Sequence, residues 1–132
     1  MDEVMKWLMN YCMDHSIGVV YRNDLPEDAP SVSYQNPNLI IFNDQYHDAL
    51  AKPFILAHEI GHVVNGNPEC INLINGSSQE ENIADRFAIN LLWEYCLDQD
   101  IWFDNIYDFA TAFCIPNDKY YLLDKEVNYG VL

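Results

Sequence analysis

The chain has 132 residues, the length of one ordinary domain, and half of them are apolar by a broad count. This composition argues against a disordered protein, and no apolar run approaches the roughly 20 residues of a membrane span. The 21 acidic and 6 basic residues give a net charge of −15, which disfavours nucleic acid and anionic membranes as partners and favours a basic protein.

The cysteines and the start of the chain bear on the cellular compartment. The sequence opens with Met-Asp-Glu rather than a basic segment and an apolar core, so we expect no signal peptide. The four cysteines include no Cys-x-x-Cys pair, and their low density indicates reduced, buried thiols rather than a disulfide scaffold. Both features predict a cytoplasmic protein, and we expect a single domain over residues 1–132.

The first third of the chain predicts one helix and three strands. Residues 2–15 carry apolar side chains at helical spacing, which favours an amphipathic helix. Residues 17–21 form a short apolar run that is typical of a strand. Residues 31–35 alternate in polarity and residues 39–42 are β-branched and apolar, with a tight turn at 36–38, so this pair predicts a hairpin. The expected sheet is small and antiparallel.

From residue 53 onward the apolar period becomes helical. Pro53 suits the first turn of a helix, and Asn65-Gly66 suits its end. After a polar loop at 67–76, Ser77-Ser78-Gln79-Glu80 offers a capping box for a second helix that ends near Leu97. A short helix over residues 104–113 and a last helical turn near 118–124 are expected later in the chain. The predicted fold class is α+β, with the small antiparallel sheet packed on a helical bundle.

The segment His58-Glu59-Ile60-Gly61-His62 lies inside the first of these helices. Residues four apart share a helix face, so His58 and His62 can bind one metal ion through their ring nitrogens. Glu59 lies about 100° further around the helix, where a carboxylate can accept a proton from an attacking water molecule. The spacing therefore indicates the chemistry of a zinc peptidase. The alternative is an ordinary helix with two surface histidines.

Gly61 interrupts this helix with a residue that costs about 1 kcal/mol relative to alanine in a helix interior. Its presence predicts that another backbone packs closely against the helix at that point.

A catalytic zinc site needs a third protein ligand. A third-histidine motif fails because Pro68 stands at the required position, and the remaining histidines have no matching spacing. The acidic candidates are Glu69, Glu80 and Glu81. Glu81 is favoured because Asp85 shares its helix face and can orient a ligand histidine from outside the metal shell. The alternative is that Glu81 is only a first-turn acid that supports the helix.

Two stretches of the chain carry a family resemblance. Leu56-Ala57-His58-Glu59-Ile60-Gly61-His62 and Glu81-x-x-Ala84-Asp85-Arg86-Phe87-Ala88, followed by Leu91-Leu92, resemble the ImmA/IrrE family of gluzincin-like zinc metallo-endopeptidases. The resemblance implies one zinc ion per chain, with His58, His62 and Glu81 as ligands and Glu59 as the catalytic base. The sequence departs from the family pattern at Ile83, often a second glutamate, and at Trp93-Glu94, often Met-Pro. These departures affect packing and partner rather than the inferred ligands.

The same resemblance suggests a substrate. Members of that family often act on a helix-turn-helix repressor, commonly in phages and other mobile elements. The resemblance therefore implies that this chain hydrolyses a peptide bond in such a repressor. The rival interpretation is a zinc-containing binding module that sequesters a transcriptional regulator without efficient proteolysis.

Two further features allow more than one interpretation. Tyr46 or His47, just before the metal helix, can supply the donor that stabilises an oxyanion, but a loop tyrosine and a solvated histidine explain them more simply. Leu39–Phe42 fits either an edge strand that pairs with an extended substrate or a buried central strand.

Overall fold

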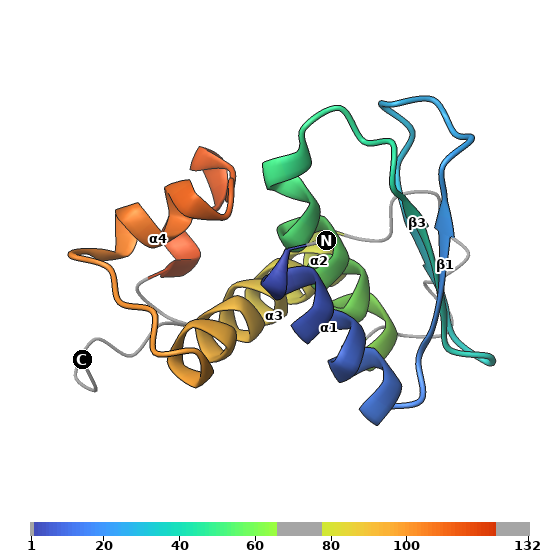
Figure 1. Cartoon of the computed structure of the whole chain (residues 1–132), viewed down its shortest axis with the longest axis horizontal. Helices are drawn as coiled ribbons and strands as arrows, with labels where there is room; N and C mark the ends of the chain where they lie inside the picture. The colour runs from blue at the N-terminus through green and yellow to red at the C-terminus, as the bar shows by residue number, and fades with distance from the viewer. Residues whose placement is uncertain (1, 66–77, 124–132) are drawn as a thin grey trace.

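The structure is a computed structural model that describes residues 2–65 and 78–123. A three-stranded sheet lies at one end, the helices α1 and α2 pack against it, α3 packs against α2, and α4 lies at the opposite end (Figure 1). The elements follow in the order α1 (Glu3–Asp14), β1 (Gly18–Arg22), β2 (Val32–Tyr34), β3 (Leu39–Asn43), η1 (Ala49–Ala51), α2 (Lys52–Asn65), α3 (Ser78–Asp98), α4 (Ile106–Ala112) and η2 (Asn117–Leu122), where η marks a 3₁₀ helix.

This element order confirms the α+β class. The predicted helices at 2–15 and 104–113 correspond to α1 and α4, and the last predicted turn corresponds to η2. The predicted loop at 67–76 and the first residue of the capping box lie outside the described residues. Within the described ranges, no helix combines the length and the apolar character needed to cross a membrane.

Local chemistry explains where two of the helices begin. The Asp2 carboxylate accepts a hydrogen bond from the Met5 N–H and caps α1. The Asn105 side chain accepts from the N–H groups of Tyr107 and Asp108 and caps α4. Each cap satisfies backbone donors that the first turn of a helix leaves without an intrahelical partner.

The sheet has the strand order β1-β3-β2. The predicted hairpin is confirmed, because β2 pairs antiparallel with β3 and Ser33 lies opposite Ile40. The expectation of a wholly antiparallel sheet is wrong for β1, which pairs parallel with β3. The chain reverses once between β1 and β2 and again in the hairpin, so β3 recovers the direction of β1.

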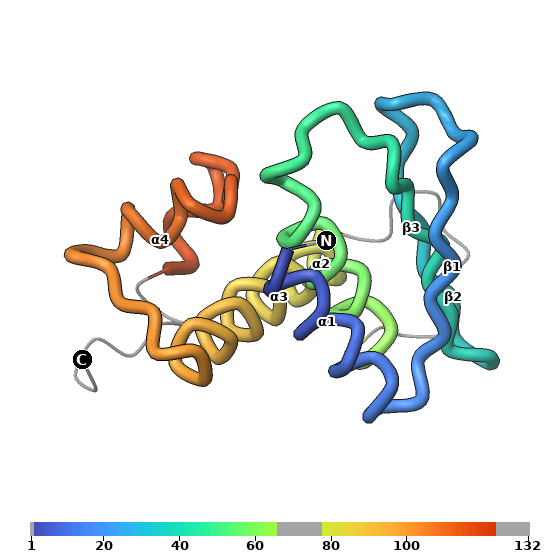
Figure 2. Tube along the Cα trace, in the orientation of Figure 1, coloured from blue at the N-terminus to red at the C-terminus, as the bar shows by residue number. Residues whose placement is uncertain are grey.

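The central strand is β3, so the edge-strand interpretation of Leu39–Phe42 is wrong. Ile40 and Phe42 are fully buried, and Tyr21 of β1 packs its ring against Phe42 with centroids 5.2 Å apart. Among the described residues, β1 and β2 are the edge strands of the sheet. The tube in Figure 2 shows the three strands side by side, with α1 running across in front of α2.

The helices α2 and α3 pack closely against each other at Gly61. A Cβ placed on Gly61 would lie 3.0 Å from both Cα and O of Ala84 and 3.2 Å from Cβ of Phe87. The prediction that another backbone packs against Gly61 is therefore confirmed. The glycine lets α3 approach α2, the helix that carries His58 and His62, closely enough for side chains of both helices to meet.

This contact gives a testable expectation for Gly61→Ala. Alanine should gain about 1 kcal/mol of helix propensity, but overpacking typically costs about 1–3 kcal/mol and here it acts on backbone atoms of Ala84. We expect a net loss of up to about 2 kcal/mol in the free energy of unfolding, measured by urea denaturation. An increase in the free energy of unfolding would show that α2 and α3 can move apart to accept the methyl group without losing packing energy.

Candidate metal centre

Two neighbouring helices supply the three predicted metal ligands. His58 and His62 come from α2, and Glu81 comes from the first turn of α3. Nε2 of His58 lies 2.9 Å from Oε2 of Glu81, and Nε2 of His62 lies 3.2 Å from Oε1 of the same carboxylate. The two Nε2 atoms are 3.1 Å apart. The structure therefore brings together the three residues that the sequence singled out, and they could hold a metal ion.

The spacing of these donor atoms can be compared with the demands of zinc. With bonds of about 2.0–2.1 Å and tetrahedral angles, two ligand atoms of one zinc ion are about 3.3 Å apart. The two imidazole nitrogens are 3.1 Å apart, and each lies 2.9 or 3.2 Å from a different oxygen of Glu81, all within a few tenths of an ångström of this value. Two imidazole nitrogens and one carboxylate also match the ligand types of a catalytic zinc site, which keeps a fourth position open. The donor set fits zinc.

Asp85 occupies the position expected of an orienting carboxylate. Its Oδ1 lies 2.8 Å from Nδ1 of His58, so a proton on Nδ1 can be donated to Asp85 while Nε2 faces Glu81 and His62. The other oxygen, Oδ2, accepts from Nζ of Lys119 at 2.8 Å. The carboxylate is buried, and both of its oxygens have partners.

The charges of this cluster affect its protonation. Burial alone would lower the pKa of His58, but the hydrogen bonds to Asp85 and Glu81 outweigh it and raise that pKa to about 10. Burial would raise the pKa of Glu81, but the hydrogen bonds from His58 and His62 lower it to about 2. The surrounding carboxylates therefore favour the positively charged form of His58.

Glu59 is buried beside the ligands rather than among them. Its residue is 8% exposed, and burial raises the pKa of its carboxyl group, against the opposing effects of His58, His62 and a hydrogen bond from Ser33. A carboxylate with a raised pKa is better suited to take and return a proton near neutral pH. Ser33 lies on the edge strand β2, which places the edge of the sheet next to Glu59.

Three polar residues near the site were not predicted. Ser33 contacts Glu59, Lys119 contacts Asp85, and Gln35 donates to the backbone oxygen of Val63 at 2.8 Å. The alternation of residues 31–35 offers one usable signal, because it turns Ser33 to the face opposite Val32 and Tyr34. The contact between Lys119 and Asp85 has no signal in the sequence, because the two residues are 34 positions apart (119 − 85) and belong to different helices.

The other candidates do not join this cluster. Among the described residues, the group of histidine, cysteine and acidic side chains that could share one ion consists of His58, His62 and Glu81 and leaves out Glu80. Glu69 lies outside the described residues.

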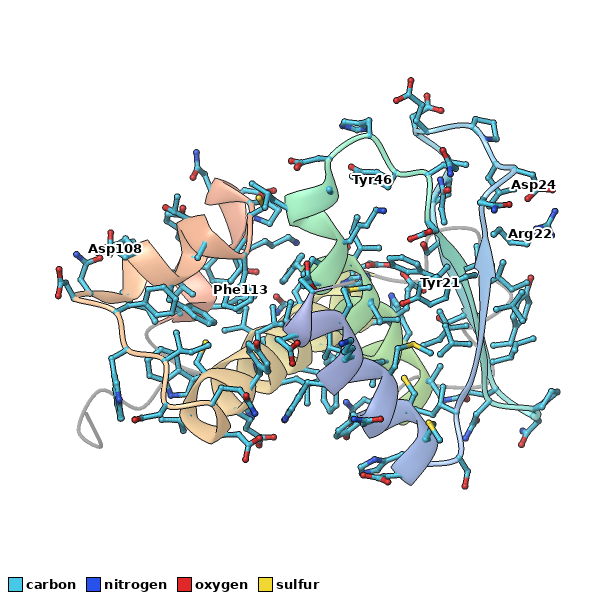
Figure 3. The ribbon with its side chains drawn as sticks, in the orientation of Figure 1. Tyr21, Arg22, Asp24, Tyr46, Asp108 and Phe113 are labelled. Carbon is cyan, nitrogen blue, oxygen red and sulfur yellow. The ribbon has the colours of Figure 1, made fainter. Side chains whose placement is uncertain are left out.

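Tyr46 and His47, the possible oxyanion donors, contact each other instead. Their rings are tilted by 35° with centroids 4.4 Å apart, and the backbone N–H of His47 donates to the backbone oxygen of Glu27. Figure 3 shows Tyr46 in the connection between β3 and α2. Their described contacts support the simpler interpretation, a loop tyrosine and an exposed histidine.

Comparison with known proteins now identifies the class. The model of the Peptidase U49 family matches residues 1–115, so the chain belongs to that family and is a peptidase. The match covers the metal motif, Glu81 and Asp85, and ends before η2. The comparisons find no matching curated protein and no matching solved structure.

Proposed function

We propose that this peptidase is a zinc-dependent metallo-endopeptidase, with His58, His62 and Glu81 as zinc ligands and Glu59 as the catalytic base. The observation that carries the proposal is the convergence of two imidazole nitrogens, 3.1 Å apart, on the Glu81 carboxylate, one on each of its oxygens at 2.9 and 3.2 Å, with the buried carboxylate of Glu59 next to His58 in the chain. Membership in a peptidase family and the resemblance to ImmA/IrrE metallopeptidases support the same assignment.

Each residue of the proposed site has its own role in the reaction. A zinc ion held here would polarise the peptide carbonyl and make a water molecule more acidic. Glu59 accepts the proton from the attacking water and then delivers it to the leaving amine, as a general base that becomes a general acid. Asp85 keeps the ring of His58 in one orientation, and Ser33 holds the Glu59 carboxylate through a hydrogen bond.

The proposed substrate is a protein, and we favour a helix-turn-helix repressor of a phage or other mobile element. This part of the proposal rests on the ImmA/IrrE resemblance and on the net charge of −15, which repels nucleic acid and attracts a basic partner. We also propose a cytoplasmic location, because the thiols of Cys12 and Cys96 are free and buried, as is common in a reducing compartment.

Co-expression tests this proposal directly. The chain is produced together with a helix-turn-helix repressor encoded beside it, and the repressor is analysed by mass spectrometry for fragments. We expect one dominant cleavage that disappears when a zinc chelator is added to the purified pair and returns with added zinc. Cleavage that persists in chelator would rule out the metallopeptidase assignment, and binding without cleavage would favour sequestration.

A second expectation separates the two adjacent acids of α3. Glu81→Gln should weaken zinc affinity sharply, because a neutral amide oxygen replaces a carboxylate that lies within 2.9 and 3.2 Å of the two histidines. Glu80→Gln removes the same charge one position away and should cost only about 1 kcal/mol or less of folding stability. Zinc affinity is measured by competition with a chromogenic chelator. If Glu80→Gln weakened zinc affinity more than Glu81→Gln, Glu80 would be the third ligand instead.

A further inference from the structure

We infer that Lys119 is a positioning residue of the metal centre: it fixes the Asp85 carboxylate, which in turn fixes the imidazole of His58. The inference rests on the proposed metal site and adds to it a residue from the C-terminal 3₁₀ helix η2. Lys119 lies after residue 115, where the match to the Peptidase U49 model ends.

Asp85 forms a bridge between two partners. One oxygen lies 2.8 Å from Nδ1 of His58, and the other lies 2.8 Å from Nζ of Lys119. The Asp85 side chain is 5% exposed, and the Lys119 side chain is 28% exposed. A carboxylate this deeply buried is stabilised only when its charge is compensated and both oxygens are bound. Lys119 supplies the compensating charge without occupying the oxygen that His58 uses.

The lysine is presented by an anchored segment rather than a free surface loop. The Tyr121 hydroxyl of η2 donates to Oδ1 of Asn82 on α3 at 2.7 Å. The backbone N–H of Lys119 donates to the backbone oxygen of Pro116. Leu122 and Leu123, at the end of the segment, are 1% exposed. These contacts restrict the positions that the Lys119 ammonium group can reach.

The two side-chain contacts from η2 meet α3 on one face. Asn82 and Asp85 are three residues apart, so they lie about one helical turn from each other. Glu81 stands next to Asn82 and four residues before Asp85. The segment η2 therefore supports α3 at the turn that carries a proposed metal ligand and its orienting carboxylate.

The test replaces Lys119 by methionine, which keeps most of the side-chain volume and removes the charge and the donors. We expect zinc affinity, measured by chelator competition, to fall by about 10- to 100-fold, the usual effect of losing an outer-shell partner of a metal site. The visible absorption of the cobalt-substituted protein should also change, because the ring of His58 loses its fixed orientation. Lys119→Arg keeps the charge and should restore affinity to within a few-fold of the wild-type value.

The matched control is Lys6→Met on α1. Lys6 pairs with Glu3 at 3.8 Å on the exposed surface, so this variant changes the net charge equally and should leave zinc affinity and the cobalt spectrum unchanged. A loss of affinity in Lys6→Met equal to that in Lys119→Met would overturn the inference, because overall charge would then explain both.

A double-mutant cycle tests whether Lys119 acts through Asp85. In an Asp85→Asn background, Lys119→Met should cause little further loss of zinc affinity, whereas two independent losses would contradict the inference. If Lys119→Met does not fold, Lys119→Gln carries the same comparison, and unchanged affinity in it would overturn the inference. Wild-type protein that binds no zinc would instead refute the proposed function, so the two failures are distinguishable.

Discussion

Glu59→Gln should retain its zinc and lose peptide cleavage by roughly 10²- to 10⁴-fold, the usual contribution of a general base. Glutamine has nearly the same volume as glutamate, and Glu59 is not one of the three residues whose donor atoms could share one ion. The substitution therefore leaves the metal-binding groups in place and removes the buried carboxylate that can accept a proton beside them. Zinc content and the rate of repressor cleavage are measured on the same preparation.

Glu94→Gln provides the matched control for this variant. Glu94 lies exposed on α3, so the same chemical change there should affect neither zinc content nor cleavage. Equal cleavage rates in Glu59→Gln and the wild type would eliminate the proposed mechanism. Partner binding by both proteins with cleavage by neither would favour the sequestration role.

His58→Ala and His62→Ala should each remove zinc from the protein. Each variant deletes one of three proposed ligands, so the loss of affinity should exceed the 10- to 100-fold that is typical of an outer-shell partner. His58→Ala also leaves the buried Asp85 carboxylate without its imidazole partner, so we expect it to lower the stability of the fold more than His62→Ala. Metal content after dialysis and the thermal midpoint of unfolding check both expectations.

His47→Ala is the control for the histidine variants. His47 is exposed and its ring contacts that of Tyr46 rather than a proposed ligand, so its loss should leave zinc occupancy unchanged. Full zinc occupancy in both His58→Ala and His62→Ala would show that the metal site has been assigned to the wrong residues.

The site was predictable from the sequence to the extent that its geometry is local. The four-residue spacing of His58 and His62 fixes their common face in any α-helix, and the structure brings Glu81 to that face. Choosing Glu81 over its neighbours needed a second local pattern, the four-residue spacing to Asp85. Gly61 indicated the close approach of the partner helix because a helix interior otherwise disfavours glycine.

The features that sequence reasoning missed depend on contacts between distant segments. The parallel pairing of β1 with β3 follows from two chain reversals, whereas the strand pattern reports only which residues are apolar. Ser33 and Lys119 reach the site from a strand and a 3₁₀ helix whose positions relative to α2 are fixed by the whole fold. Periodicity along one element carries no information about such contacts.

Metal analysis of protein purified without added zinc or chelator tests the central claim most directly. The wild-type chain and Glu59→Gln should each contain one zinc ion per chain, and His58→Ala should contain almost none. Wild-type protein that carries no zinc and gains none on titration, or His58→Ala protein that keeps a full equivalent, would contradict the assignment of the metal centre.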